Sequence, residues 1–101
     1  MEPGIPDISI SDVVLSTAGR DQGQLFYCVA TEEPFVWLAD GKGRTLDKPK
    51  RKKRKHVQKV LRAETRVADK LRRGDKVLNS ELRRDLAFLS REMQSNDLGG
   101  F

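Results

Sequence analysis

Two short apolar runs, separated by only four residues, constrain the fold of this chain more than any other feature. Residues 25–30 (LFYCVA) and 35–39 (FVWLA) are dense in β-branched and aromatic side chains. Runs of five or six such residues suit strands and are short for helices. Asp40-Gly41 follows the second run, and this dipeptide is a strong signal for a tight turn. The segment therefore predicts neighbouring strands in a small sheet.

Further strands are predicted on both sides of this pair. An apolar pattern starts at Ile8 and continues through residues 13–15, and the glycine-bounded stretch 19–23 separates it from the next strand. A short fourth strand is predicted at residues 44–46. Several short strands at close spacing indicate a small β-barrel, which we place over residues 8–47.

Charge is distributed very unevenly along the chain. The 101 residues carry a net charge of +5. Residues 1–47 hold 3 Lys/Arg and 8 Asp/Glu, residues 48–73 hold 13 and 2, and residues 74–101 hold 4 and 5. The positive charge is therefore concentrated in one central segment, which favours a polyanionic partner.

Residues 48–56 (KPKRKKRKH) form the densest part of that segment and contain no acid. Self-repulsion predicts that this run, the basic tether, is extended when free. Lysine and arginine at this density release counterions from phosphates, which gives affinity without sequence choice. The alternatives are a solvated linker, a nuclear localisation signal and attachment to an anionic membrane. The run has no apolar or aromatic residue, which argues against insertion into a bilayer.

Helical periodicity follows the basic tether, over residues 57–95. Apolar residues recur on one helical face from Val57 to Leu71, and Gly74 is a plausible stop. A second helix is predicted from Asn79 or Ser80, both good N-caps. Its apolar face comprises Leu82, Leu86, Leu89 and Met93. Phe88 points away from that face.

Several motifs resemble those of a known family. The segment 13–38, with Gly19 and Gly23 bounding a loop between strands, resembles the KOW motif of ribosomal large-subunit proteins and transcription elongation factors. The resemblance extends through residues 16–23, 38–41, 48–50, 56–57 and 78–83 to small bacterial KOW-domain RNA-binding proteins. These are similar to the fourteenth large-subunit ribosomal protein of archaea and eukaryotes. One departure is Gln22, because the family often has Lys or Arg there.

The strand and helix patterns together predict a mainly β fold with an α extension, in which a barrel precedes the basic tether and two C-terminal helices. The resemblance implies that this barrel is SH3-like (KOW). It also implies a non-enzymatic, cytoplasmic and ribosome-associated protein that binds RNA, with large-subunit ribosomal RNA and ribosomal proteins as partners. The candidate RNA-binding residues are Gly19, Arg20, Gln22, Gly23, Lys42, Arg44, Lys48, Lys50, Arg51, Lys52, Lys53, Arg54, Lys55, His56, Lys59 and Arg62. Either Arg20 makes the phosphate contact that Gln22 does not, or this loop contributes less to RNA binding than it does in the family.

Two other functions fit the same residues. The barrel and Phe88 suit a protein-interaction module that docks on RNA polymerase or a translation factor. The second function is that of a ribosome-associated factor, which binds only in some growth states. Four aromatic residues are candidates for stacking on unpaired bases, although core packing is favoured for most of them: Phe26, Tyr27, Phe35 and Trp37. Alternation also predicts that one of Phe26 and Tyr27 is exposed.

Catalytic residues are poorly represented. His56 lies inside a cationic run, a setting that suits a phosphate contact better than base catalysis. Cys28 lies in an apolar strand and cannot form a disulfide within the chain, a pattern typical of the reducing cytosol. Asp21 and Asp40 flank glycines and are typical turn residues. We expect no enzyme activity, no cofactor or metal, no small-molecule substrate and no membrane segment.

Overall fold

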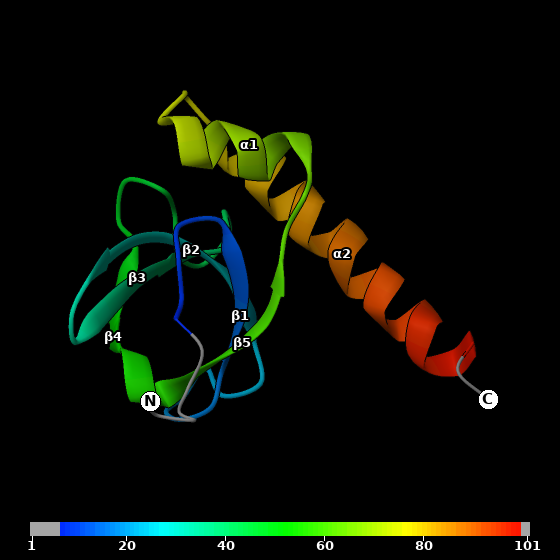
Figure 1. The fold of residues 1–101 in the computed structure, drawn as a ribbon, viewed down its shortest axis with the longest axis horizontal. Helices are drawn as coiled ribbons and strands as arrows, with labels where there is room; N and C mark the ends of the chain where they lie inside the picture. Colours follow the sequence, from blue (N-terminus) through cyan, green and yellow to red (C-terminus); the bar gives the residue numbers. More distant parts are fainter. Residues whose placement is uncertain (1–6, 100–101) are drawn as a thin grey trace.

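The computed structural model describes residues 7–99 and contains one antiparallel sheet and two helices (Figure 1). The strands are β1 (Asp12–Ser16), β2 (Leu25–Glu32), β3 (Phe35–Ala39), β4 (Lys50–Lys53) and β5 (Val57–Arg62). Their order in the sheet is β4-β3-β2-β1-β5. The helices are α1 (Arg66–Arg73) and α2 (Asn79–Gly99).

The two edge strands of the sheet are consecutive in the chain. A single 3₁₀ turn (Arg54–His56) joins β4 to β5, so the sheet curls round toward itself (Figure 1). Backbone hydrogen bonds fix this turn, from Thr17 N to the His56 carbonyl and from Arg54 N to the Pro34 carbonyl, both at 2.9 Å. The turn is therefore attached both to the β1–β2 loop and to the turn between β2 and β3.

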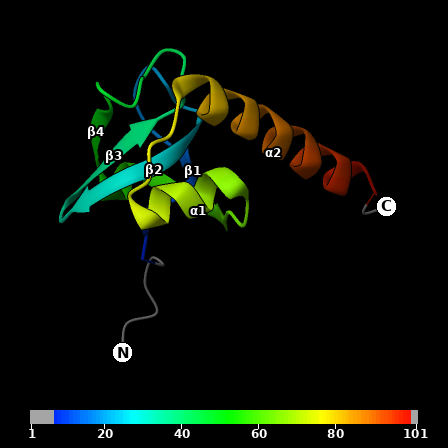
Figure 2. The same cartoon turned by 90° about the horizontal axis from the view of Figure 1, so that it is seen from above.

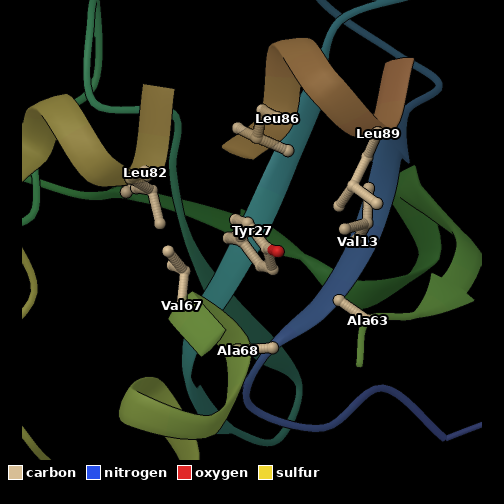
Figure 3. Packing of buried hydrophobic residues seen from close by; sticks show 9 residues of the cluster. Val13, Tyr27, Ala63, Val67, Ala68, Leu82, Leu86 and Leu89 are labelled. Carbon is tan, nitrogen blue, oxygen red and sulfur yellow. The ribbon is translucent and has the colours of Figure 1, made fainter. Parts of the chain in front are cut away.

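Strand alternation divides the apolar residues between two cores. The first lies inside the curled sheet and comprises Ile8, Val14, Phe26, Cys28, Val36, Leu38 and Val57. The second lies between the outer face of the sheet and the helices, where Tyr27 is surrounded by the leucines of α2 and by residues of α1 (Figure 3). Phe26 and Tyr27 are both buried. The expected exposure of one of them is wrong, because the helices cover the outer face.

The end of α1 at Gly74 and the start of α2 at Asn79 are as the sequence predicts, but α1 begins at Arg66 and not at Val57. The Thr65 side chain accepts a hydrogen bond from Ala68 N at 3.1 Å and caps α1, and Gly74 ends it with a φ of 77°. The Tyr27 hydroxyl donates to the Asp85 carboxylate, which also accepts from the Thr65 hydroxyl at 2.8 Å. Burial and the neighbouring carboxylate raise the pKa of Tyr27 well above its usual range. This shared carboxylate links both helices to β2.

The apolar face predicted for α2 is confirmed. Leu82, Leu86 and Leu89 are buried against the sheet, Met93 is partly buried and Phe88 is exposed. The helix then continues past the edge of the sheet, as the view from above shows (Figure 2). The buried side chains of α2 described by the structure therefore lie between Leu82 and Leu89.

Three of the expected elements differ from those observed. Residues 44–46 form no strand but part of a loop, in which the Asp40 carboxylate accepts from Lys42 N and Arg44 N, both at 2.9 Å. Residues 50–53 of the basic tether form β4, paired with β3 in the register Phe35↔Lys53 to Leu38↔Lys50. Residues 57–62 form β5 instead of a helix, because period-two alternation buries Val57 while the next residue, Gln58, is exposed.

Candidate nucleic-acid interface

Two loops that are distant in sequence meet at one end of the sheet. The β1–β2 loop (residues 17–24) and the β3–β4 loop (residues 40–49) border a hollow of about 420 Å³. A second hollow of about 300 Å³ lies between the same loops and α2. Asp40 lines both, so the two hollows adjoin. We call the pair the loop groove; its charged lining residues are Arg20, Asp21, Asp40, Lys42, Arg44, Lys50 and Arg83.

Glycines give the β1–β2 loop its path. Gly19 and Gly23 have φ values of 89° and 92°, in the left-handed region that side chains disfavour. Gly23 N donates to the Ser16 carbonyl at 2.8 Å, and Gln22 N donates to the Gly19 carbonyl at 3.2 Å. The turn leaves the side chains of Arg20 and Gln22 exposed.

A buried ion pair holds this loop against β4. Lys52 Nζ donates to Asp21 Oδ1 and to the Ala18 carbonyl, both at 2.7 Å, and the side chain is only 8% exposed. Ser16 Oγ also donates to Asp21, and Lys50 Nζ lies 3.2 Å from its other oxygen. Burial alone would raise the pKa of Asp21, but the bonds from Lys52, Ser16 and Lys50 outweigh it and hold the pKa well below its usual range.

The β3–β4 loop is fixed by the start of α2. Arg83 Nη1 donates to the Gly41 carbonyl at 2.9 Å, and Leu46 N donates to Asn79 Oδ1 at 2.8 Å. Gly41 itself touches the helix so closely that an added Cβ would lie 2.2 Å from the Asn79 carbonyl oxygen. The position of this loop therefore depends on the helix as well as on the sheet.

Seven predicted cations remain available for a ligand. In residues 7–99 each of them is without an ion pair: Arg20, Lys42, Arg44, Lys48, Arg51, Lys53 and Lys55. All seven are exposed. Arg20, Lys42 and Arg44 border the loop groove, and Lys48 lies in the β3–β4 loop. Arg51, Lys53 and Lys55 belong to β4 and the 3₁₀ turn.

Other predicted residues are occupied within the protein. Besides Lys50 and Lys52, Lys59 Nζ lies 3.2 Å from the buried carboxylate of Asp12, and Arg62 pairs with Glu64 at 3.0 Å. Arg54 lies 3.4 Å from Asp7 and 3.6 Å from Glu33. His56 is partly buried in the 3₁₀ turn. The predicted cations therefore form two groups. Some pair with acidic residues of the protein and stabilise the fold, and the others face outward without such a partner in residues 7–99.

Arg83 is a groove residue that the sequence prediction omits. It lies on α2 but lines the second hollow beside Lys42. Its helical position predicts an ordinary solvated side chain, and only the tertiary packing of α2 against the β3–β4 loop brings it here. No feature of the sequence indicates this placement.

The Cys28 thiol, the possible metal ligands and the two helices bear on catalysis, metal binding and membrane insertion. Burial raises the pKa of the Cys28 thiol to about 11, which leaves it protonated and a poor nucleophile at neutral pH. Among the described residues no three potential metal ligands gather. Neither helix, as far as residue 99, has the length and hydropathy needed to cross a bilayer.

No family model matches this chain, and no curated protein is similar to it. The positions and charges of the residues described above therefore carry the functional argument.

Proposed function

We propose that the chain is a non-enzymatic RNA-binding protein with an SH3-like barrel of the KOW class, which binds ribosomal RNA of the large subunit in the cytoplasm. One observation carries the proposal. Two glycine-containing loops from different parts of the chain form one groove, which is bordered by exposed arginine and lysine residues that make no ion pair within residues 7–99. A groove of this charge suits a phosphate backbone.

The fold supports the first part of the proposal. Five short antiparallel strands curl into one sheet around an apolar interior, with the two edge strands joined by a single 3₁₀ turn. An SH3-like barrel requires this arrangement. The loop between its first two strands, Gly19 to Gly23, is the one that resembles the KOW motif.

Phosphate recognition in the groove would be by charge and shape. Arg20 and Arg44 face the same hollow, and a planar guanidinium can donate two hydrogen bonds to one phosphate. Lys42 adds a third cation beside Asp40. Such contacts position a protein on RNA and carry little sequence information. Arg20 then supplies the charge that Gln22 lacks.

Charge reversal tests the groove directly. We expect Arg20→Glu with Arg44→Glu to weaken binding of structured RNA and to reduce the slope of log K against log salt by about 0.7–0.9 for each phosphate that is no longer neutralised. Filter binding across a salt series measures both. Arg84→Glu with Arg91→Glu makes the same change in net charge on the opposite side of α2. An equal loss in this control pair would remove the case for the groove.

Sedimentation of the tagged full chain from lysate tests the ribosomal part. The wild type should migrate with large subunits at low salt and be stripped at high salt, and the Arg20/Arg44 variant should remain at the top. A wild type that stays at the top at both salt concentrations would contradict ribosome binding. Deletion of residues 48–56 is not a useful test, since it removes β4.

A second function has its own supporting observation. Phe88 is 48% exposed on α2 and lines a hollow of about 430 Å³ with Val67 and Arg84. A protein-interaction module that docks on RNA polymerase or a translation factor would use this face. Under this alternative Phe88→Ala abolishes association with the partner, whereas the Arg20/Arg44 variant retains it.

A further inference from the structure

The helices leave part of the outer sheet face uncovered. On β3, Ala39 packs in the core beneath the helices, but Trp37 and Phe35 lie further along the same face and are only partly buried. Their partners on β4 are Arg51 and Lys53. Directly paired residues point to the same side of a sheet, so two aromatic rings and two exposed cations share this face.

Contacts between three of these side chains, Phe35, Trp37 and Arg51, hold them in defined positions. The rings of Phe35 and Trp37 meet edge to face, with centroids 6.5 Å apart and planes at 65°. The Arg51 guanidinium lies 4.4 Å from the centroid of the Phe35 ring. A cation over an aromatic face is held by the ring quadrupole. Arg51 therefore has a defined position beside Trp37 although it makes no ion pair in residues 7–99.

Trp37 also forms part of the wall of a hollow of about 810 Å³ between the sheet and the link from α1 to α2. Its apolar lining comes from both sides and comprises Val29, Ala30, Leu46, Pro49, Leu71 and Val77. Hollows of about 300–1,000 Å³ are typical of sites for small ligands. This hollow is large enough for one or two flat rings against the indole.

The lining of this hollow carries charges of both signs, and the adjoining strand β4 adds two exposed cations. Asp75 and Glu32 are the acids in its lining, and Asp75 is paired with Arg73 at 2.9 Å. Lys76 lines the same hollow and has no ion pair in the described part of the chain. With Arg51 and Lys53 on the adjoining strand, cations exceed unpaired acids at this surface.

We propose that this hollow binds an unpaired nucleotide of the RNA, with the base stacked on Trp37 and the flanking phosphates at Arg51 and Lys53. The inference rests on the proposed function and adds a second contact to it. Stacking on aromatic rings beside a cationic path is how proteins hold single-stranded RNA. Lys50, on β4, faces the loop groove, and Arg51 is on the other face of the same strand. An RNA that occupies the groove would therefore pass round the edge at β4 to reach Trp37.

The single tryptophan of the chain provides the test. We would titrate the full chain with a single-stranded RNA of about ten nucleotides, within the usual range for one binding domain, and with a duplex of equal length. Stacking predicts quenching of Trp37 fluorescence by the single strand, and binding of the duplex without that quenching. Anisotropy of labelled RNA gives the affinities independently.

Variants at Trp37 separate stacking from charge. Trp37→Leu keeps an apolar side chain but loses the aromatic face, and should weaken single-strand binding by about 5- to 150-fold. Trp37→Phe should retain most of the affinity, and both should bind the duplex as the wild type does. Phe88→Ala, which removes an exposed aromatic ring on α2, should change neither the affinity for the single strand nor the affinity for the duplex. Thermal unfolding checks that each variant is folded.

Three outcomes would overturn the inference. If the single strand binds without quenching and Trp37→Leu has wild-type affinity, the hollow holds no base, while the proposed function stands. The proposed function fails as well if neither RNA binds and the Arg20/Arg44 variant sediments from lysate as the wild type does. Quenching by a proline-rich peptide that RNA does not displace would assign the hollow to peptides. If Trp37→Leu does not fold, the wild-type quenching and the affinity of Trp37→Phe decide.

Discussion

The carboxylate of Asp21 fixes the side chains of two lysines of the basic tether, Lys50 and Lys52. It accepts a hydrogen bond from Lys52 inside the protein and lies 3.2 Å from Lys50 at the groove. A buried ammonium without a partner is costly, so Lys52 depends on this acid. At the residue scale, part of the cationic charge therefore serves to fix the β1–β2 loop.

Asp21→Asn should accordingly destabilise the fold. Because it leaves Lys52 buried without a counter-charge, we expect a loss of about 3 kcal/mol in the free energy of unfolding. The pKa of Asp21 is lower in the folded chain than the usual value of about 3.9. The contribution of ionised Asp21 to the free energy of unfolding is therefore complete above about pH 5 and declines as the pH falls toward 2.

Urea unfolding at several pH values measures this difference. The gap between wild type and Asp21→Asn should be constant near neutrality and narrow in acid. Glu92→Gln, which neutralises an exposed carboxylate on α2, should leave stability within about 0.5 kcal/mol of the wild type. A gap that stays constant down to pH 2 would mean that the Asp21 ion pairs do not stabilise the fold.

At the scale of elements, α2 fixes the β3–β4 loop, and Gly41 is the tightest point of contact. Gly41→Ala places a Cβ 2.2 Å from the Asn79 carbonyl oxygen, at a φ of 79°. We expect about 1–3 kcal/mol of destabilisation from the overlap and about 1–2 kcal/mol from the left-handed backbone. The loop should also shift from the helix, so RNA affinity should fall.

Gly43→Ala is the matched control. An added Cβ at Gly43, in the same loop, meets nothing within 4 Å. Calorimetric unfolding should show Gly43→Ala close to the wild type and Gly41→Ala destabilised, and filter binding should show that Gly41→Ala has lost RNA affinity. Equal behaviour of the two variants would contradict a fixed contact between loop and helix.

The sequence predicts some elements well and others poorly, for identifiable reasons. The apolar runs at β2 and β3 and the capped end of α1 have strong local signals, and the structure matches them. β4 has no apolar residue (KRKK) and becomes a strand through backbone pairing with β3, with Lys52 neutralised by Asp21. The start of β5 has apolar residues at Val57, Val60 and Leu61, a spacing that also fits a helix.

The site was predictable in part. Glycine-bounded loops and exposed cations could be identified from the sequence, including Arg20 and Arg44. The use of Lys52 and Lys59 inside the fold depends on Asp21 and Asp12, whose proximity arises only from strand pairing. Whether these loops bind RNA stays a prediction.

At the scale of the whole molecule, the sheet is shared by two cores. β1 and β2 contribute Val13 and Tyr27 to the helix-covered core and Val14 and Phe26 to the inner one. Removal of both helices would expose the first pair to water, and each fully buried apolar side chain contributes about 1.5–3 kcal/mol.

We therefore expect a fragment of residues 1–64 not to fold cooperatively. Circular dichroism should show a broad, shallow thermal transition, and the fragment should bind a hydrophobic dye, while the full chain unfolds in one sharp step. A fragment with a sharp transition would show that the curled sheet is stable alone.

β4 lies at an edge of the sheet, where unpaired backbone groups are open to strand addition by another copy of the chain. All four residues of β4 are lysine or arginine. Two copies brought edge to edge would place these like charges side by side, which disfavours such pairing. The composition that makes this strand hard to recognise in the sequence thus also protects the protein against self-association, and this protection weakens wherever a polyanion neutralises the strand.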